Sequence, residues 1–234
     1  MIETSMKEML EAGVHFGHQA FRWNPKMAPF IFTVKNGVHI FDLVQTQEKL
    51  QKAIAVAEEI ASKGGVILFV GTKKQAKEII KTEAERAKMP FINDRWLGGL
   101  LTNFSTIARR ISYFKDLEKQ LEEGADAKLS KKDNILREKE FCKLKGYLGG
   151  IKDLKKLPDA LFVIDTHKEG LAISEANKLN IPVIGIVDSN ANPDPIDYVI
   201  PGNDDAVRSI KYITSAVASA ILEGSGTLKE KEQI

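Results

Sequence analysis

Residues 66–71 read Val66-Ile67-Leu68-Phe69-Val70-Gly71, an uninterrupted apolar run that stops at a glycine. Similar runs follow at 160–164 (Ala-Leu-Phe-Val-Ile) and 182–187 (Pro-Val-Ile-Gly-Ile-Val), with shorter ones at 90–92 and 198–200. Strands with continuous rather than alternating apolar residues are typical of a parallel sheet that is covered on both faces. The sequence therefore predicts the α/β class, with a doubly wound five-stranded parallel sheet.

Helical patterns separate these runs. A pattern that starts at Thr46 repeats apolar residues at helical spacing and precedes the first strand. Further helices are predicted at about 75–87, 170–179 and 204–222. The last twelve residues, 223–234, hold two glycines and several charges, so we expect a flexible tail there.

One segment interrupts the alternation of strands and helices. Residues 105–123 carry apolar side chains three and four apart, Gly124 ends this pattern, and Ser130 with Asp133 begins a second helix that runs to about Tyr147. Both helices are otherwise strongly charged, so little of their surface can enter the main core. We expect an antiparallel helical hairpin that protrudes from the α/β domain.

The N-terminal region predicts a helix and a β-hairpin. Ser5 and Glu8 form a capping-box pattern, and Gly13 suits the end of a short helix. Asn36-Gly37 lies between two β-rich runs, which is a strong hairpin signal. The chain is thus divided into an N-terminal segment (1–45), an α/β domain (46–104 and 148–222), an inserted helical hairpin (105–147) and a tail (223–234).

Composition restricts the class of protein. Of 234 residues, 43% are hydrophobic and 28% are charged, which is typical of globular proteins. The net charge of +2 is too small for a protein that coats polyanions, so a nucleic-acid surface has to be a local patch. We expect a cytoplasmic protein without a membrane partner, because no apolar stretch is long enough for a membrane helix and one cysteine permits no internal disulfide.

The predicted strand ends carry polar residues, and doubly wound domains bind ligands at that edge of the sheet. Lys73, Asp165, His167 and Asp188 could serve an enzyme that acts on a small molecule. The phosphate-loop pattern is incomplete, because the position five before Gly71 holds a valine rather than a glycine. No nucleophile or complete acid–base pair is evident, which weakens the enzyme hypothesis.

A metal site is a second possibility at the same edge. Asp188, Asp204 and Asp205 could bind a divalent metal, zinc or magnesium, with His18 completing a mixed nitrogen and oxygen ligand set. The competing interpretation is that Asn203 caps the last helix while the two following acids complement its dipole.

Two segments combine cations with aromatic side chains. Residues 21–27 read Phe-Arg-Trp-Asn-Pro-Lys-Met, and residues 95–104 read Arg-Trp-Leu-Gly-Gly-Leu-Leu-Thr-Asn-Phe, with Arg109 and Arg110 following. Arginines contact phosphates and planar groups stack on unpaired bases, so these segments suit RNA. The alternative is that both tryptophans are core residues and the arginines are merely solvated.

Several longer motifs resemble one family. Gly13-Val14-His15-Phe16-Gly17-His18, Arg95-Trp96-Leu97-Gly98-Gly99 and Ile200-Pro201-Gly202-Asn203-Asp204-Asp205 are similar to motifs of ribosomal protein S-two, the second protein of the bacterial small ribosomal subunit. The motifs at 23–27, 69–73, 101–103, 148–150, 158–160 and 192–194 match in the same order. The resemblance covers about residues 5–224.

This resemblance implies a flavodoxin-like fold and a structural, non-catalytic role on the ribosome. It implies binding to small-subunit rRNA, support of subunit assembly and translation, contacts with neighbouring ribosomal proteins, and docking of the mRNA-binding ribosomal protein S-one. It implies no small-molecule substrate and no required cofactor. Carried onto this sequence, the residues expected to face RNA are Arg22, Trp23, Asn24, Lys26, Arg95, Trp96, Asn103, Arg109 and Arg110.

Overall fold

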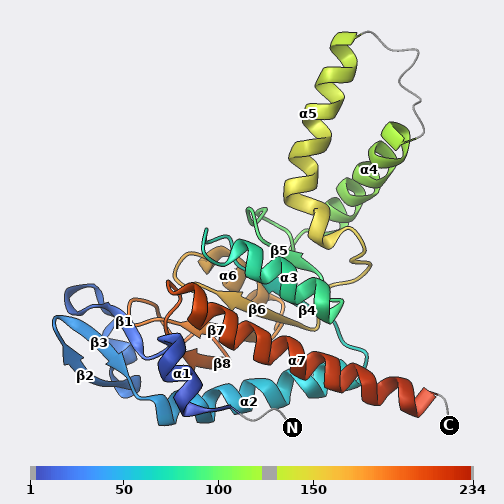
Figure 1. Cartoon of the computed structure of the whole chain (residues 1–234). Coiled ribbons are helices and arrows are strands. Elements are labelled where there is room, and N and C mark those ends of the chain that lie inside the picture. Colours follow the sequence, from blue (N-terminus) through green and yellow to red (C-terminus); the bar gives the residue numbers. More distant parts are fainter. Residues whose placement is uncertain (1–3, 123–130, 233–234) are drawn as a thin grey trace.

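The computed structural model of the chain describes residues 4–122 and 131–232. A helix-covered sheet forms the body, a small β module lies at one end of it, and two helices project from the body (Figure 1). Among the described helices, none combines the length and the apolarity that are needed to cross a membrane.

The central sheet has five parallel strands: β4 (Ile67–Val70), β5 (Phe91–Ile92), β6 (Ala160–Ile164), β7 (Val183–Val187) and β8 (Tyr198–Pro201). Their spatial order is β5-β4-β6-β7-β8, so the strand that comes first in the chain lies inside the sheet. This is the flavodoxin-like order of a doubly wound sheet, and it confirms the predicted fold class.

Successive residues of each strand enter two separate cores. Ile67 and Phe69 pack against α2 (Leu43–Ser62), α3 (Lys77–Ala87) and α7 (Val207–Glu232) on one face of the sheet. Leu68 and Val70 enter the other core, with α6 (Gly170–Lys178) and the base of the projecting helices. Because both faces are buried, the strands need apolar residues at every position, which is the pattern seen in the sequence.

The N-terminal module contains α1 (Met6–Ala12), β1 (Phe16–Gln19), β2 (Ile31–Lys35) and β3 (Val38–Phe41), with the strand order β1-β3-β2. The predicted hairpin is confirmed: Asn36 and Gly37 have φ of 52° and 76°, and two positive φ angles are what a tight hairpin turn requires. Strand β1 was not expected from the sequence, and among the described residues it pairs with β3 at the edge of this small sheet.

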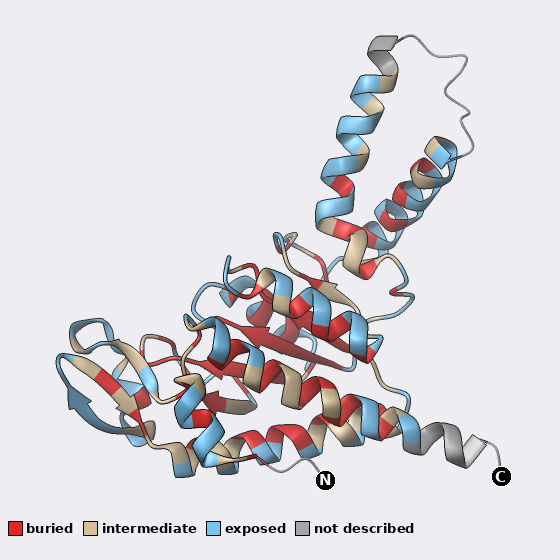
Figure 2. Ribbon diagram, in the orientation of Figure 1, coloured by how far each residue is buried: buried red, intermediate tan, exposed pale blue. Residues whose placement is uncertain are grey.

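The projecting helices are α4 (Phe104–Glu122) and α5 (Lys131–Leu148). In α4 the buried residues are Ile107, Ile111, Phe114 and Leu117, and the buried residues among the described side chains of α5 are Leu144 and Leu148. Figure 2 shows that the buried part of α5 lies at the end nearest the body. The predicted hairpin is therefore confirmed, while the predicted stop at Gly124 and start at Ser130 lie outside the described residues.

The C-terminal boundary was predicted wrongly. Helix α7 continues to Glu232 instead of ending near residue 222. A Cβ atom on Gly224 would lie 2.4 Å from the backbone oxygen of Glu58 in α2. This glycine therefore lets two long helices approach each other, and it does not end the helix.

Candidate functional site

The first candidate segment is held by hydrogen bonds and one buried methionine, while its two rings are exposed to different extents. The side chain of Asn24 accepts a hydrogen bond from the Lys26 backbone nitrogen (3.0 Å), at the start of the short helix η2 (Pro25–Phe30). The Asn24 backbone nitrogen donates to the Ser189 oxygen (2.7 Å), and Met27 is fully buried. Phe21 and Trp23 keep 77% and 39% of their surface exposed.

The two cations of this segment differ in their partners. The guanidinium carbon of Arg22, an exposed residue, lies 5.3 Å from the centre of the Phe21 ring. Lys26 forms an ion pair with Asp194. Arg22 is thus available to an anion, whereas Lys26 has to share or give up its carboxylate partner to bind one.

The second candidate segment presents four exposed polar side chains. Arg95, Asn103, Arg109 and Arg110 are all exposed. Arg95 makes no hydrogen bond or ion pair within the described residues. Arg109 donates only a long bond of 3.4 Å to the Ser105 backbone oxygen, one helical turn before it.

Trp96 corrects the predicted set of RNA-facing residues. Its side chain is only 7% exposed, and its Nε1 donates a hydrogen bond to Glu175 Oε1 (3.1 Å). A buried ring cannot stack on a base from solvent, so Trp96 is a core residue.

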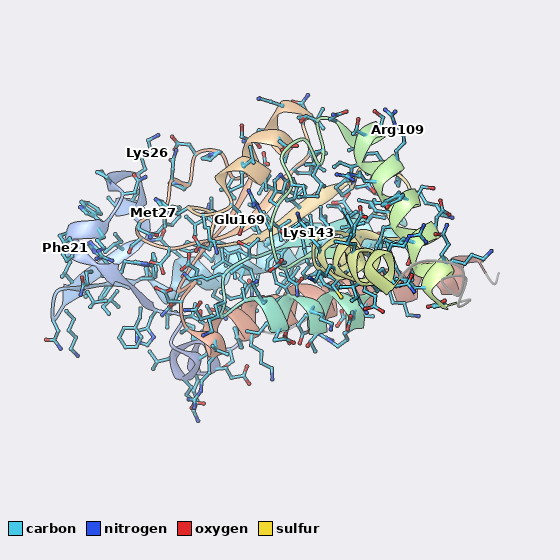
Figure 3. All side chains as sticks on the ribbon, turned by 90° about the horizontal axis from the view of Figure 1, so that it is seen from above. Phe21, Lys26, Met27, Arg109, Lys143 and Glu169 are labelled. Atoms are coloured by element: carbon cyan, nitrogen blue, oxygen red, sulfur yellow. The ribbon has the colours of Figure 1, made fainter. Side chains whose placement is uncertain are left out.

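Both segments lie on the same side of the sheet. Met27 from the first segment and Trp96, Leu100 and Leu101 from the second enter the core that α6 covers. In the view from above, Lys26 and Arg109 lie along the same margin of the molecule (Figure 3). The two segments therefore pack on the same face of the sheet, which we name the α6 side.

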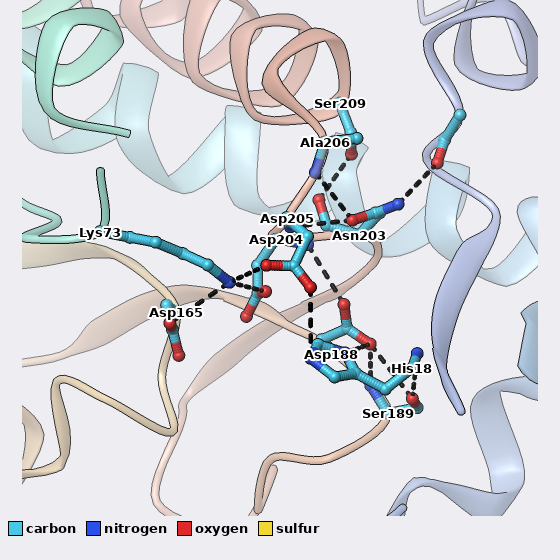
Figure 4. Close-up of polar contacts among 11 residues, drawn as sticks. His18, Lys73, Asp165, Asp188, Ser189, Asn203, Asp204, Asp205, Ala206 and Ser209 are labelled. Atoms are coloured by element: carbon cyan, nitrogen blue, oxygen red, sulfur yellow. Dashed lines mark hydrogen bonds and ion pairs between the residues drawn. The ribbon is translucent and has the colours of Figure 1, made fainter. Parts of the chain in front are cut away.

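A polar cluster occupies the carboxyl ends of the strands (Figure 4). His18 Nδ1 lies 3.0 Å from Asp188 Oδ1, and His18 Nε2 lies 3.3 Å from Asp205 Oδ2. Lys73 Nζ lies 2.6 Å from Asp204 Oδ1, 2.6 Å from Asp205 Oδ1 and 3.4 Å from Asp165 Oδ2. The structure thus brings all four predicted metal ligands together and adds a lysine to them.

Burial and mutual repulsion shape the electrostatics of this cluster. Burial, and then the charges of Asp188 and Asp165, raise the pKa of Asp204 to about 7, against the opposing effect of Lys73. Burial would lower the pKa of Lys73, but its three carboxylate partners raise it above its ordinary value. The hydrogen bond to Asp188 raises the pKa of His18 although burial opposes this.

Three of these residues could hold a cation. Ligand atoms of His18, Asp188 and Asp204 all lie within 4.8 Å of one another. Asp204 is 1% exposed, and its Oδ2 is buried without a hydrogen-bond partner. Because four carboxylates face one lysine and one histidine, the cluster carries excess negative charge that a divalent cation would reduce.

The same geometry separates the residues of the enzyme hypothesis. Lys73 is held by carboxylates rather than offered to a phosphate. His167 instead lines a pocket of about 590 Å³ with Thr166, Ser174 and Asn192. A Cβ atom on Gly71 would lie 2.4 Å from Ile80 Cδ1, so this glycine is explained by packing between strand and helix.

Sequence reasoning missed two residues that organise the site. The Ser189 hydroxyl accepts from the His18 backbone nitrogen (2.9 Å) and joins the N-terminal module to the sheet. Glu175 is 4% exposed and accepts hydrogen bonds from the loop of the second segment. Its position beside the buried Ala172 and Ala176, on the apolar face of α6, is the signal that could have identified it.

Comparison of the chain with models of known protein families gives a match over residues 9–224, and the matching family is described as ribosomal protein S2.

Proposed function

Because the chain belongs to the ribosomal protein S2 (S-two) family and is thereby a structural component of the small ribosomal subunit, we propose that it binds small-subunit rRNA through its α6 side. The proposed contacts come from the two exposed segments, at residues 21–26 and 95–110. In this proposal the cations bind phosphates and set the position of the protein, while the loop backbone and ring side chains fit the shape of the RNA.

One observation carries this proposal most strongly. Two segments about seventy residues apart pack their buried residues into the same core on one face of the sheet and each carries exposed cations, although the chain as a whole has a net charge of only +2. Arg22 and Arg95 are not neutralised by any ion pair in the described part of the chain. A local basic surface on a nearly neutral protein suits a partner that is bound in one orientation.

The proposal is tested by neutralising four cations together and measuring rRNA binding over a range of salt concentrations. The test variant replaces Arg22, Lys26, Arg95 and Arg109 by glutamine. If each cation contacts one phosphate, the slope of log affinity against log salt falls by about 3. Affinity should fall at every salt concentration while the melting temperature stays close to that of the wild type.

The matched control removes four exposed cations from α2, α3 and α7, on the opposite face of the sheet. It replaces Lys52, Lys81, Arg208 and Lys211 by glutamine. Its net charge equals that of the test variant, so an effect of overall charge would appear in both. Equal binding by the test variant and the wild type would refute the proposed surface.

We also propose that the N-terminal module supports the docking of ribosomal protein S-one. Phe16, Phe32 and Val34 are 46%, 75% and 49% exposed. Phe16 and Phe32 line a pocket of about 600 Å³ beside β2. Contiguous exposed apolar residues favour a protein partner. Phe32→Ser should weaken capture of purified S-one, whereas Leu171→Ser, which changes a residue 55% exposed on α6, should not.

For the strand-end cluster we propose a divalent cation held by His18, Asp188 and Asp204. The unpartnered Asp204 Oδ2 favours this, and a histidine ligand favours zinc over magnesium. Elemental analysis after dialysis should find about one zinc per chain, and the metal should disappear in Asp204→Asn. A chelator should also lower the melting temperature of the wild type but leave that of Asp204→Asn unchanged. A metal-free wild type with an unchanged melting temperature would end this proposal.

A further inference from the structure

Helix α6 places one buried carboxylate directly beneath the loop of residues 95–104. Glu175 Oε1 accepts from Trp96 Nε1 (3.1 Å) and from the Gly99 backbone nitrogen (2.8 Å). Glu175 Oε2 accepts from the Leu101 nitrogen (3.0 Å) and from the nitrogen and hydroxyl of Thr102 (both 3.2 Å). Five donors from seven consecutive residues thus converge on a side chain that is 4% exposed.

The donors are hydrogen-bonding groups of the loop rather than a cation. Within the described residues, Glu175 takes part in no ion pair, although a buried charge without compensation is costly. Burial would raise the pKa of Glu175, but the hydrogen bonds from Trp96, Gly99, Thr102 and Leu101 hold it below its ordinary value. The carboxylate is therefore retained as an anion that the loop surrounds.

This arrangement fixes which residues of the loop face inward and which face solvent. Trp96, Leu100 and Leu101 are buried, whereas Arg95 and Asn103 are exposed. Gly99 has a φ of +82°, so the chain reverses locally above the carboxylate.

The same loop also sets where α4 begins. The Asn103 backbone oxygen accepts from the nitrogens of Thr106 and Ile107, at the start of the helix that carries Arg109. A change in the loop therefore moves both Arg95 and the first turns of α4.

We propose that Glu175 is a positioning residue for RNA binding: it holds the 95–104 loop in the one shape that presents Arg95, Asn103 and Arg109 together. This inference rests on the proposed function of the α6 side. Glu175 itself does not touch RNA, because it is covered by the loop that it organises.

Glu175→Gln is the sharpest perturbation, since the side chain keeps its shape. A carboxylate only accepts hydrogen bonds, whereas an amide carries one accepting oxygen and one donating NH₂ group. In either orientation the NH₂ group meets two N–H donors, those of Trp96 and Gly99 at the Oε1 position or those of Leu101 and Thr102 at the Oε2 position, and only the Thr102 hydroxyl can turn to accept from it. The loop therefore has to move away from α6 on that side.

Glu169→Gln is the matched control. Glu169 is also 4% exposed and lies just before α6, and it accepts from the nitrogen and hydroxyl of Thr72 (3.0 and 2.6 Å). The substitution removes the same charge from a similarly buried carboxylate, but within the described residues the side chain of Glu169 makes no hydrogen bond or ion pair with the 95–104 loop. It thus reports the effect of losing a buried acid without disturbing the loop.

The experiment compares the full-length wild type with both variants in three measurements: thermal unfolding, amide hydrogen exchange, and binding to small-subunit rRNA over a range of salt. In Glu175→Gln we expect faster exchange at Gly99, Leu101 and Thr102. We also expect about tenfold weaker rRNA binding, and a salt slope reduced by about 1 to 2 because one or two phosphate contacts are lost. Glu169→Gln should lower the melting temperature but keep the affinity and the slope.

The outcomes separate the inference from the function on which it rests. If wild-type protein does not bind rRNA, the proposed function fails. If the wild type binds and a folded Glu175→Gln binds equally well despite faster exchange in the loop, the positioning role is refuted.

If Glu175→Gln does not fold, Trp96→Phe decides, because it removes one donor and keeps a buried ring. A loss of about threefold with faster exchange at Gly99 supports the inference. Wild-type affinity in that variant contradicts it.

Discussion

Gly150→Ala should destabilise the protein at the base of the helical hairpin. An added Cβ atom would lie 2.2 Å from the Phe91 backbone oxygen and 2.7 Å from Cδ2 of the same residue. Contacts of real Cβ atoms essentially never fall below 3.0 Å, so η4 (Gly149–Ile151) and β5 must separate by at least 0.8 Å. The obstacle is backbone, which cannot rotate away as a side chain can.

The expected magnitude follows from overpacking rather than from backbone strain, because neither Gly149 nor Gly150 has a positive φ. Inserting a methyl group into a tightly packed site costs about 1–3 kcal/mol. For a chain of this length that lowers the melting temperature by roughly 2–12 °C.

Calorimetry of Gly150→Ala against Gly149→Ala provides the test. At Gly149 the nearest atom to an added Cβ is Lys145 Cγ at 3.7 Å, an ordinary contact, so this control should stay within about 0.5 kcal/mol of the wild type. If both variants melt at the wild-type temperature, the close approach of η4 to β5 does not limit stability. The overpacking predicted for Gly150→Ala is then refuted.

Three further predictions concern other parts of the fold. Gly224→Ala should cost about 1–3 kcal/mol, because its Cβ atom would meet the backbone of α2 at 2.4 Å, whereas Gly226→Ala, with no atom within 4 Å, should melt at or above the wild-type temperature. Lys73→Met should cost about 3–5 kcal/mol in urea unfolding, because buried carboxylates lose their cation. Lys63→Met, which breaks a solvent-exposed pair with Glu59, should leave the urea unfolding midpoint close to that of the wild type. The pKa of Glu175 is lowered on folding, so its carboxylate stabilises the protein above its ordinary pKa of 4.5, and this contribution is lost as the pH falls below that value. The stability difference between wild type and Glu175→Gln should therefore shrink in acid, and a constant difference from pH 7 to pH 3 would contradict this.

The central sheet was predictable because its strands are buried on both faces, so their apolar residues run without interruption. Strand β1 could not be predicted, because its sequence, Phe16-Gly17-His18-Gln19, is short, half polar and contains a glycine. Its strand geometry comes from pairing with β3, which is a tertiary contact. The end of α7 was predicted wrongly for a related reason. Two glycines and several charges at 223–234 predict a flexible tail, and only the position of α2 shows that Gly224 allows two helices to pack closely.

The candidate site was predictable where chain topology alone determines it. Parallel strands bring their carboxyl ends to one edge, which places Asp165 and Asp188 near each other. His18 was grouped with the acids from its ligand chemistry, but the strand β1 that brings it to them is not predicted by any rule for strand ends. Trp96 was misjudged because a combination of cations and aromatic side chains suits RNA, whereas the acid that accepts a hydrogen bond from its ring lies on α6, about eighty residues away in the chain.

The bond between the His18 nitrogen and the Ser189 hydroxyl joins residues 171 positions apart. At a synthesis rate of about 5–20 residues per second, Ser189 is made roughly 9–34 s after His18. The N-terminal module therefore leaves the synthesising ribosome long before the residues that anchor it exist. During that interval the exposed rings and strand edges of the module lack the sheet against which they pack, so the newly made chain is most vulnerable to aggregation until only about its last fifth remains to be translated.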